Sequence, residues 1–157
     1  MRIRATVILL ALLGTACSRD VAASPRLSTT AVVLRQGAAT LRLIVEVADS
    51  EPERELGLMG RRSLASDAGM LFVFPSPVLV SFYMKDTLIP LDIAFVDRGR
   101  VAEIRSMVPC HTHKCPLTTP VSQFDQAIEV NPRTFSNAGI AAGATVEVVG
   151  PLPSPTS

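Results

Sequence analysis

The sequence predicts a mainly β domain with two short helices, a β-rich α+β fold whose sheet is barrel-like or sandwich-like. Short apolar segments of strand length recur along the chain, and Gly, Pro, Asn or Asp residues separate them. Only two segments carry helix-start signals. With 157 residues, the chain is long enough for one compact domain with a hydrophobic core of its own.

Strand signals dominate the central part of the chain. The segment LRLIVEV carries apolar residues at every second position, the period of a half-buried strand: Leu41, Leu43, Val45 and Val47. Further strands are predicted at 69–74, 78–84, 91–97, 100–107, 124–130 and 144–149, with a break at the prolines of PSP and a hairpin at Arg98 and Gly99.

The first short helix is predicted directly after Ser50. Ser50 can cap the first turn, and Glu53, three residues later, can return the hydrogen bond, which makes a capping box. Gly60 is expected to end the helix. Leu56 and Met59 are three residues apart, so both are expected on the inner face.

The second short helix is predicted between Asn131 and Gly139. Asn131 suits the cap position, where its side chain can accept a hydrogen bond from the first turn. Pro132 suits the first helical position, because its missing N–H would have no partner there. Gly139 is a suitable end, since glycine adopts the left-handed conformation that stops helices.

Composition divides the chain into four parts. Residues 1–17 form an export signal, and residues 18–39 are small, polar and weakly patterned, as expected of a flexible tether. Within this tether, the apolar patch AVVL at 31–34 is a candidate edge strand. The β-rich domain is predicted over 40–150, and 151–157 is a proline-rich tail that we expect to be frayed.

The N-terminus predicts export to the bacterial cell envelope. Arg2 and Arg4 precede the apolar run ATVILLALL, which is too short to span a membrane as a permanent helix. Small residues and then Cys17 follow. This order resembles a bacterial lipoprotein signal, which implies a lipid on Cys17 and a periplasm-facing, membrane-anchored domain. Ordinary cleavage near Ala16, which would release a free exported protein, is the alternative.

Charge and aromatic content limit the classes of partner. The formal net charge is +1, from 15 basic and 14 acidic side chains, and no basic stripe is present, so we expect no nucleic-acid partner. The chain has no Trp and one Tyr, which argues against a platform for stacking bases or sugars. The partners we expect are the membrane, through Cys17, and an unknown small ligand or envelope protein.

The segment PCHTHKCP contains both histidines and the two remaining cysteines of the chain: Cys110, His111, His113 and Cys115. In an exported protein, the first interpretation is a disulfide between Cys110 and Cys115. The alternative is a metal site, because two thiolates and two imidazoles supply a tetrahedral set of donors for zinc or copper. A catalytic cysteine is a third interpretation, although nothing marks one thiol as the nucleophile. We expect no cofactor.

Four methionines raise a second metal hypothesis, because thioethers bind Cu(I): Met59, Met70, Met84 and Met107. The favoured interpretation is that these side chains fill the core of the β-rich domain beside Leu and Phe.

Charges interrupt the apolar segment FYMKDTLIPLDI. Lys85 and Asp86 are expected at a turn between two core strands, since buried unpaired charges are costly. The competing hypothesis places Lys85, Asp86 and Asp92 at the mouth of a ligand-binding pocket. Arg54, near the first helix with Arg61 and Arg62, either faces an anionic ligand or is solvated.

Several segments together resemble a bacterial and archaeal family, domain of unknown function 192. They are ERELGLMGRRSL, GMLFVF, FYMKDTLIPLDIAFVD, the step from Pro109 to Cys110 and AIEVNPRTFSNAGIAAGATVEVV, in that order, over residues 41–149. The resemblance implies a compact β-rich fold with short helices and brings no established activity. The family often has Trp where Tyr83 stands and Asn where Asp86 stands.

The function expected from the sequence is that of an envelope-associated binding module without catalysis. No Ser–His–acid order, phosphate loop or nucleotide fingerprint is present. A metal-handling accessory protein that uses the Cys/His loop or the methionines is the alternative, and an enzyme of unknown reaction is the second alternative.

Overall fold

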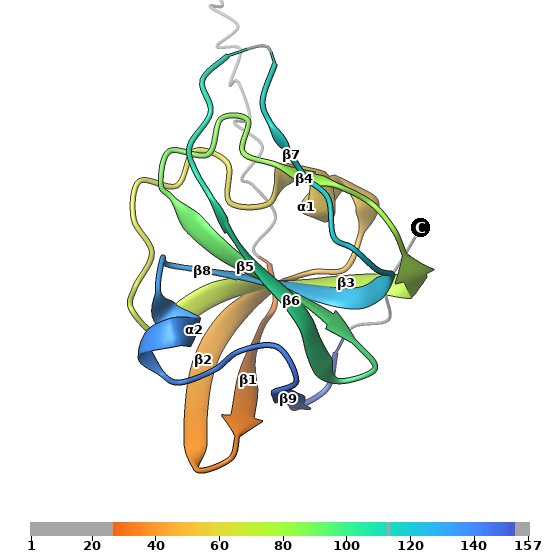
Figure 1. Cartoon of the computed structure of the whole chain (residues 1–157). Helices are drawn as coiled ribbons and strands as arrows, with labels where there is room; N and C mark the ends of the chain where they lie inside the picture. Colours follow the sequence, from red (N-terminus) through yellow and green to blue (C-terminus); the bar gives the residue numbers. More distant parts are fainter. Residues whose placement is uncertain (1–26, 113, 153–157) are drawn as a thin grey trace, which may run out of the picture.

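The computed structural model describes residues 27–112 and 114–152, which form a closed β-barrel (Figure 1). Around the barrel the strands are β1 (Thr29–Gln36), β2 (Ala39–Ala48), β3 (Ala68–Val78), β8 (Phe124–Val130), β5 (Leu91–Asp97), β6 (Arg100–Met107) and β9 (Thr145–Val149). The helices are α1 (Glu51–Leu56) and α2 (Thr134–Asn137). The mainly β class with two short helices is therefore confirmed.

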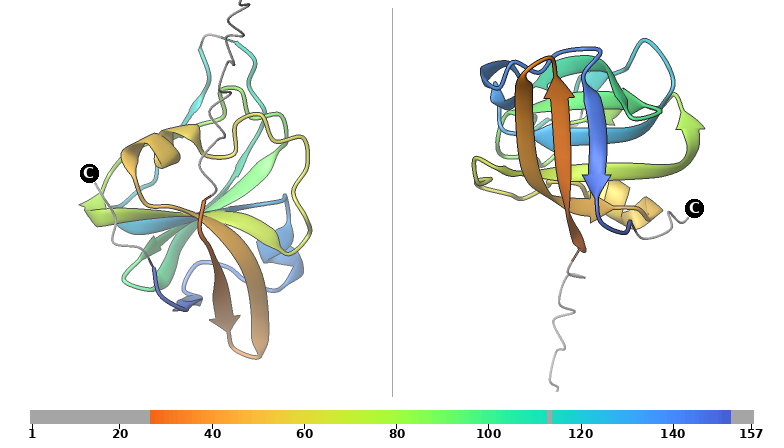
Figure 2. Two further views of the ribbon diagram at one scale, coloured as in Figure 1. Left: turned by 180° about the vertical axis from the view of Figure 1, so that it is seen from behind. Right: turned by 90° about the horizontal axis from the view of Figure 1, so that it is seen from below.

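A small second sheet and α1 cover one side of the barrel. The strands β4 (Phe82–Tyr83) and β7 (Leu117–Thr118) pair antiparallel with each other and with no barrel strand. In Figures 1 and 2, α1, β4 and β7 lie on one side of the layer made by β3, β8 and β5, while β1, β2 and β9 lie on the other. The layer of β3, β8 and β5 is consequently covered on both faces.

The barrel begins earlier than the predicted boundary at residue 40. The patch at 31–34 belongs to β1, which pairs with β2 on one side and with β9 on the other, so it is not an edge strand. Pairing with β9 closes the barrel and removes the free edge. The export signal, Cys17, the tether before residue 27 and the tail after residue 152 lie outside the described residues.

Local sequence predicted one strand boundary correctly and another wrongly. The β5–β6 hairpin is confirmed, and Arg98 and Gly99 both have positive φ, as a tight two-residue turn requires. The predicted break after residue 74 is wrong, because β3 continues through PSP to Val78 with a register shift. Only Phe82 and Tyr83 of the predicted 78–84 strand are in a strand.

The cap of α1 is confirmed, but its end and inner face differ from the prediction. The Glu53 carboxylate accepts the Ser50 backbone N–H at 3.1 Å. The helix ends at Gly57 rather than Gly60, since Gly57 has positive φ. This early end turns Leu58 inward, where it is 2% exposed, whereas Leu56 is 47% exposed.

Helix α2 starts at Thr134 and not at Asn131. Arg133, directly before it, has a left-handed backbone with φ of 65°. Its N–H donates to a carboxylate oxygen of Asp92 at 2.6 Å, and this long-range bond fixes the start of the helix. Phe135 of α2 is buried and belongs to the barrel's inner core.

The alternation of side chains along the strands produces two cores. One fills the barrel interior and includes Leu71, Ala94 and Ile128. The other lies outside the barrel wall, beneath α1 and β4, and includes Phe72 and Phe95. No helix among the described residues is long and apolar enough to cross a membrane.

Candidate functional site

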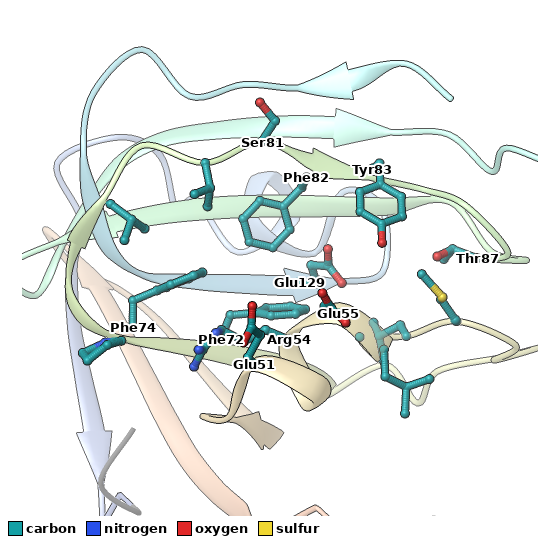
Figure 3. Close-up of a pocket in the computed structure, with 17 residues that line it drawn as sticks. Glu51, Arg54, Glu55, Phe72, Phe74, Ser81, Phe82, Tyr83, Thr87 and Glu129 are labelled. Carbon is teal, nitrogen blue, oxygen red and sulfur yellow. The ribbon is translucent and has the colours of Figure 1, made fainter. Parts of the chain in front are cut away.

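A cavity of about 550 Å³ opens in the outer core, between α1 and the segment 78–83 that contains β4 (Figure 3). The outer faces of β3 and β8 form its floor, and α1 with the turn to Met59 forms one wall. Val80 and Tyr83, which are partly exposed, lie at its mouth. The cavity exists because α1 and β4 cover the same stretch of barrel wall without packing fully against each other.

Glu129 on β8 supplies a carboxyl group to the floor of this cavity. It is only 6% exposed. Its neighbours in the two flanking strands are Met70 on β3 and Ile93 on β5, which are both fully buried and apolar. No hydrogen bond or ion pair of the Glu129 side chain is found among the described residues, and its oxygen atoms face the cavity (Figure 3).

Burial raises the pKa of Glu129 from 4.5 to about 8. The cause is loss of hydration, which disfavours the charged form when no donor or cation replaces the water. At neutral pH this group is therefore mostly an uncharged acid, able to donate one hydrogen bond. Strongly perturbed carboxyl groups in cavities are typical of functional sites.

Aromatic side chains form much of the cavity wall. Phe72 of β3 and Phe82 of β4 meet edge to face, with ring centroids 5.2 Å apart. Phe74 also lines the cavity. The guanidinium carbon of Arg54 lies over its ring, 5.2 Å from the ring centroid. Tyr83 completes the wall with its ring and its hydroxyl group turned toward the cavity (Figure 3). These walls would bury the apolar part of a bound ligand.

The charged lining of the cavity comes from α1. Glu51 and Glu55 are exposed residues that line it beside Glu129. Arg54 lines it too, but its guanidinium donates to the backbone carbonyls of Asp49 at 2.6 Å and Val73 at 3.0 Å. Of the four predicted ligand-binding residues, Arg54 alone borders this cavity.

Comparisons with known proteins agree with the overall fold of the domain. The model of the DUF192 family, described as an uncharacterised ACR, matches residues 32–148. The chain belongs to the DUF192 family. A Sinorhizobium meliloti protein described as a candidate transcription regulator is 31% identical, with a TM-score of 0.73 over 80% of this chain and 98% of that one. A Novosphingobium aromaticivorans protein of unknown function is 29% identical, with a TM-score of 0.72 over 85% and 99%. No curated protein matches the chain.

Lys85 and Asp86 form a turn of the DUF192 domain outside this cavity. Asp86 has φ of 56°, in the left-handed region that Asp and Asn tolerate better than most residues. Its carbonyl accepts the N–H of Gly60 at 2.8 Å, and the N–H of Thr87 donates to the carbonyl of Met84 at 3.2 Å. Lys85 is exposed. Backbone geometry therefore explains the residue type at position 86 without a ligand.

We expect substitutions at Asp86 to follow backbone conformation. Asp86→Asn and Asp86→Gly should change the free energy of unfolding by less than about 0.5 kcal/mol, whereas Asp86→Val should cost about 1–2 kcal/mol because a β-branched residue is strained at positive φ. Lys85→Gln, at the adjacent exposed position, is the control and should be neutral. Chemical denaturation measures all four. A neutral Asp86→Val would contradict the backbone explanation.

Asp92 does not line the cavity beside α1, and its carboxylate is hydrogen-bonded within the fold. It is buried, and its two carboxylate oxygens accept hydrogen bonds from the Ser106 hydroxyl at 2.6 Å and from the Arg133 N–H at 2.6 Å. It borders a different cavity, on the side of α2. The structure thus separates Asp92 from Arg54 and from the turn at Lys85, so the predicted residues do not form one site.

The Cys loop of the DUF192 domain brings two sulfurs to bonding distance. The Sγ atoms of Cys110 and Cys115 are 2.09 Å apart, the separation of a disulfide. Cys110 is buried in the outer core. Among the described residues, no group of three or more His, Cys, Asp or Glu could hold a metal, and His113 lies outside them. Met70, Met84 and Met107 are buried in the same core, and Met59 borders the cavity.

Sequence reasoning missed Glu129, the central residue of the cavity. The strand at 124–130 was predicted, but a Glu in an alternating strand is expected to face solvent. The missed signal lies in the neighbouring strands: GMLFVF is apolar on both faces, and LDIAF is apolar apart from Asp92, a pattern typical of strands covered on both sides. A Glu in a strand between them would be buried.

Proposed function

We propose that this DUF192 domain is an envelope-associated binding module for a small, largely apolar molecule, and that the cavity between α1 and β4 is its site. One observation carries the proposal: the buried carboxyl of Glu129, which faces the cavity and has no partner among the described residues. A bound molecule would supply the missing partner.

The energetic cost of Glu129 supports a functional role. Burying a carboxyl without a compensating hydrogen bond destabilises a fold, and Leu or Met at this position would pack well between Met70 and Ile93. Residues that lower stability in this way concentrate at functional sites. The cavity volume of about 550 Å³ is within the range of ligand pockets. The one buried carboxyl of the cavity has no paired nucleophile or base among the described lining residues, which favours binding over catalysis.

Blocking the mouth of the cavity tests this proposal. Val80 is 42% exposed at the mouth, so Val80→Trp should fill the opening without disturbing the core. Val121, 78% exposed and not part of the cavity lining, gives the control Val121→Trp. A fragment library screened by ligand-observed NMR should yield compounds that bind wild type and Val121→Trp but not Val80→Trp. A screen in which Val80→Trp binds every hit as wild type does would contradict the proposal.

The envelope location rests on the lipoprotein-type signal at the N-terminus. We expect Cys17→Ala to move the protein from the membrane fraction to the soluble fraction while its melting temperature stays unchanged, because the lipid and the barrel are independent. Fractionation of cells that express each form measures this. A variant that still sediments with membranes would show that Cys17 is not the anchor.

A further inference from the structure

We infer that the ligand of this cavity is an organic cation, an ammonium group on an apolar body, with the ammonium group against the Glu129 carboxyl. This inference deepens the proposed function and rests on it. Three features of the cavity support it: the charges of the lining, the aromatic walls and the position of the one buried acid.

The charges of the lining favour a cation. Glu51, Glu55 and Glu129 contribute three carboxyl groups, and Arg54 contributes the single cationic group. The Arg54 guanidinium is bonded to two backbone carbonyls and stacked on Phe74, at the β3 end of the wall. In Figure 3 the carboxyl groups of Glu55 and Glu129 are both turned toward the cavity. An anionic ligand would meet two or three carboxyl groups there and be repelled.

The aromatic walls favour the same class. The rings of Phe72, Phe82 and Tyr83 line the same cavity as Glu129 (Figure 3). Ring faces carry partial negative charge, so they attract an ammonium group and at the same time bury the hydrocarbon attached to it. A metal ion would gain nothing from such walls, because it requires several oxygen, nitrogen or sulfur ligands.

Binding an ammonium ion should release the proton of Glu129 to solvent, so that a carboxylate pairs with the cation. The charged or titratable groups that share the cavity are Glu51, Arg54 and Glu55 of α1 and Tyr83 of β4. The flanking strands place the uncharged Met70 and Ile93 beside Glu129. Because the free group is protonated at neutral pH, affinity for the cation should rise as pH approaches 8.

The test compares three probes of one shape and different charge: cyclohexylmethylamine, cyclohexylmethanol and cyclohexanecarboxylate. The purified full-length protein has a single Tyr, at position 83 in the cavity wall, and no Trp, so tyrosine emission reports occupancy directly. None of the probes absorbs where tyrosine does. We expect the amine to bind at least about tenfold more tightly than the alcohol at pH 8, and the carboxylate to bind most weakly.

Two matched variants locate the charge. Glu129→Gln should weaken amine binding about tenfold to hundredfold and leave alcohol binding nearly unchanged. Glu147→Gln, an exposed Glu on β9 that does not line the cavity, should behave as wild type. For wild type, amine affinity should rise about tenfold per pH unit between about pH 6 and pH 8, and this rise should disappear in Glu129→Gln.

The outcomes separate this inference from the proposed function. Tighter binding of the alcohol or the carboxylate, lost in Val80→Trp, would overturn the cation assignment and leave the cavity as the binding site. Amine binding that is unchanged in Glu129→Gln, or absent in wild type, would also overturn it. Amine binding that persists in Val80→Trp would place the cation elsewhere and contradict both.

Discussion

Replacing Glu129 with Gln should raise the melting temperature of the protein at neutral pH. In the native state burial raises the pKa of this carboxyl from 4.5 to about 8, so the native protein holds a proton that the unfolded chain has released. Each pH unit above 4.5 then costs the native state about 1.4 kcal/mol, up to about 3 kcal/mol at pH 7. Gln has no such proton, so this cost disappears.

The pH dependence identifies the cause of this stabilisation. Because the native pKa is raised, the contribution of Glu129 to stability is greatest below pH 4.5 and falls until about pH 8. The melting temperatures of wild type and Glu129→Gln should therefore be similar near about pH 4.5 and differ by on the order of 5–10 °C at pH 7. Calorimetry across this range measures the difference. A variant less stable than wild type at pH 7 would show that the carboxyl has a partner in the folded protein.

Replacing Asp92 with Ala should lower stability by about 2–4 kcal/mol. Asp92 is buried and accepts hydrogen bonds from the Ser106 hydroxyl and from the Arg133 N–H. Ala leaves both donors without their acceptor, and the left-handed backbone at Arg133 loses the bond that holds it. Urea denaturation measures the loss, which should appear as a lower transition midpoint.

The control for Asp92 lies on the same strand. Asp97 forms an ion pair with the exposed Arg98, so Asp97→Ala should cost less than about 1 kcal/mol. Neither variant should change the affinity of the cavity for cyclohexylmethylamine, since neither residue lines it. An Asp92→Ala variant as stable as Asp97→Ala, with altered ligand binding, would return Asp92 to the candidate ligand-binding residues.

Local patterns in the sequence were sufficient for most strands and for one helix cap. The alternation around Leu43 and Val45 marks β2, and the Ser50–Glu53 pair marks the start of α1. These features depend on residues a few positions apart. The role of β1 could not be predicted in the same way, because it depends on pairing with β9, more than a hundred residues later.

The candidate site depends on long-range packing for the same reason. Glu129 is buried because α1 and β4 fold over the outer face of β8, and its own strand gives no sign of that cover. Lys85 and Asp86 were candidate ligand-binding residues because charges interrupt an apolar run there. A left-handed backbone explains the type of residue at Asp86. The charge pattern in the sequence therefore marks a turn. The cavity lies elsewhere, on the covered outer face of β8.

The most direct test of cation binding at Glu129 is the titration of its side-chain carboxyl by isotope-edited NMR, without and with cyclohexylmethylamine. Cation binding against a buried, unpartnered Glu129 predicts a midpoint near pH 8 in the free protein, and a midpoint shifted toward the ordinary value of 4.5 when the amine is bound. A midpoint near 4.5 in the free protein, or one that the amine does not change, would contradict it.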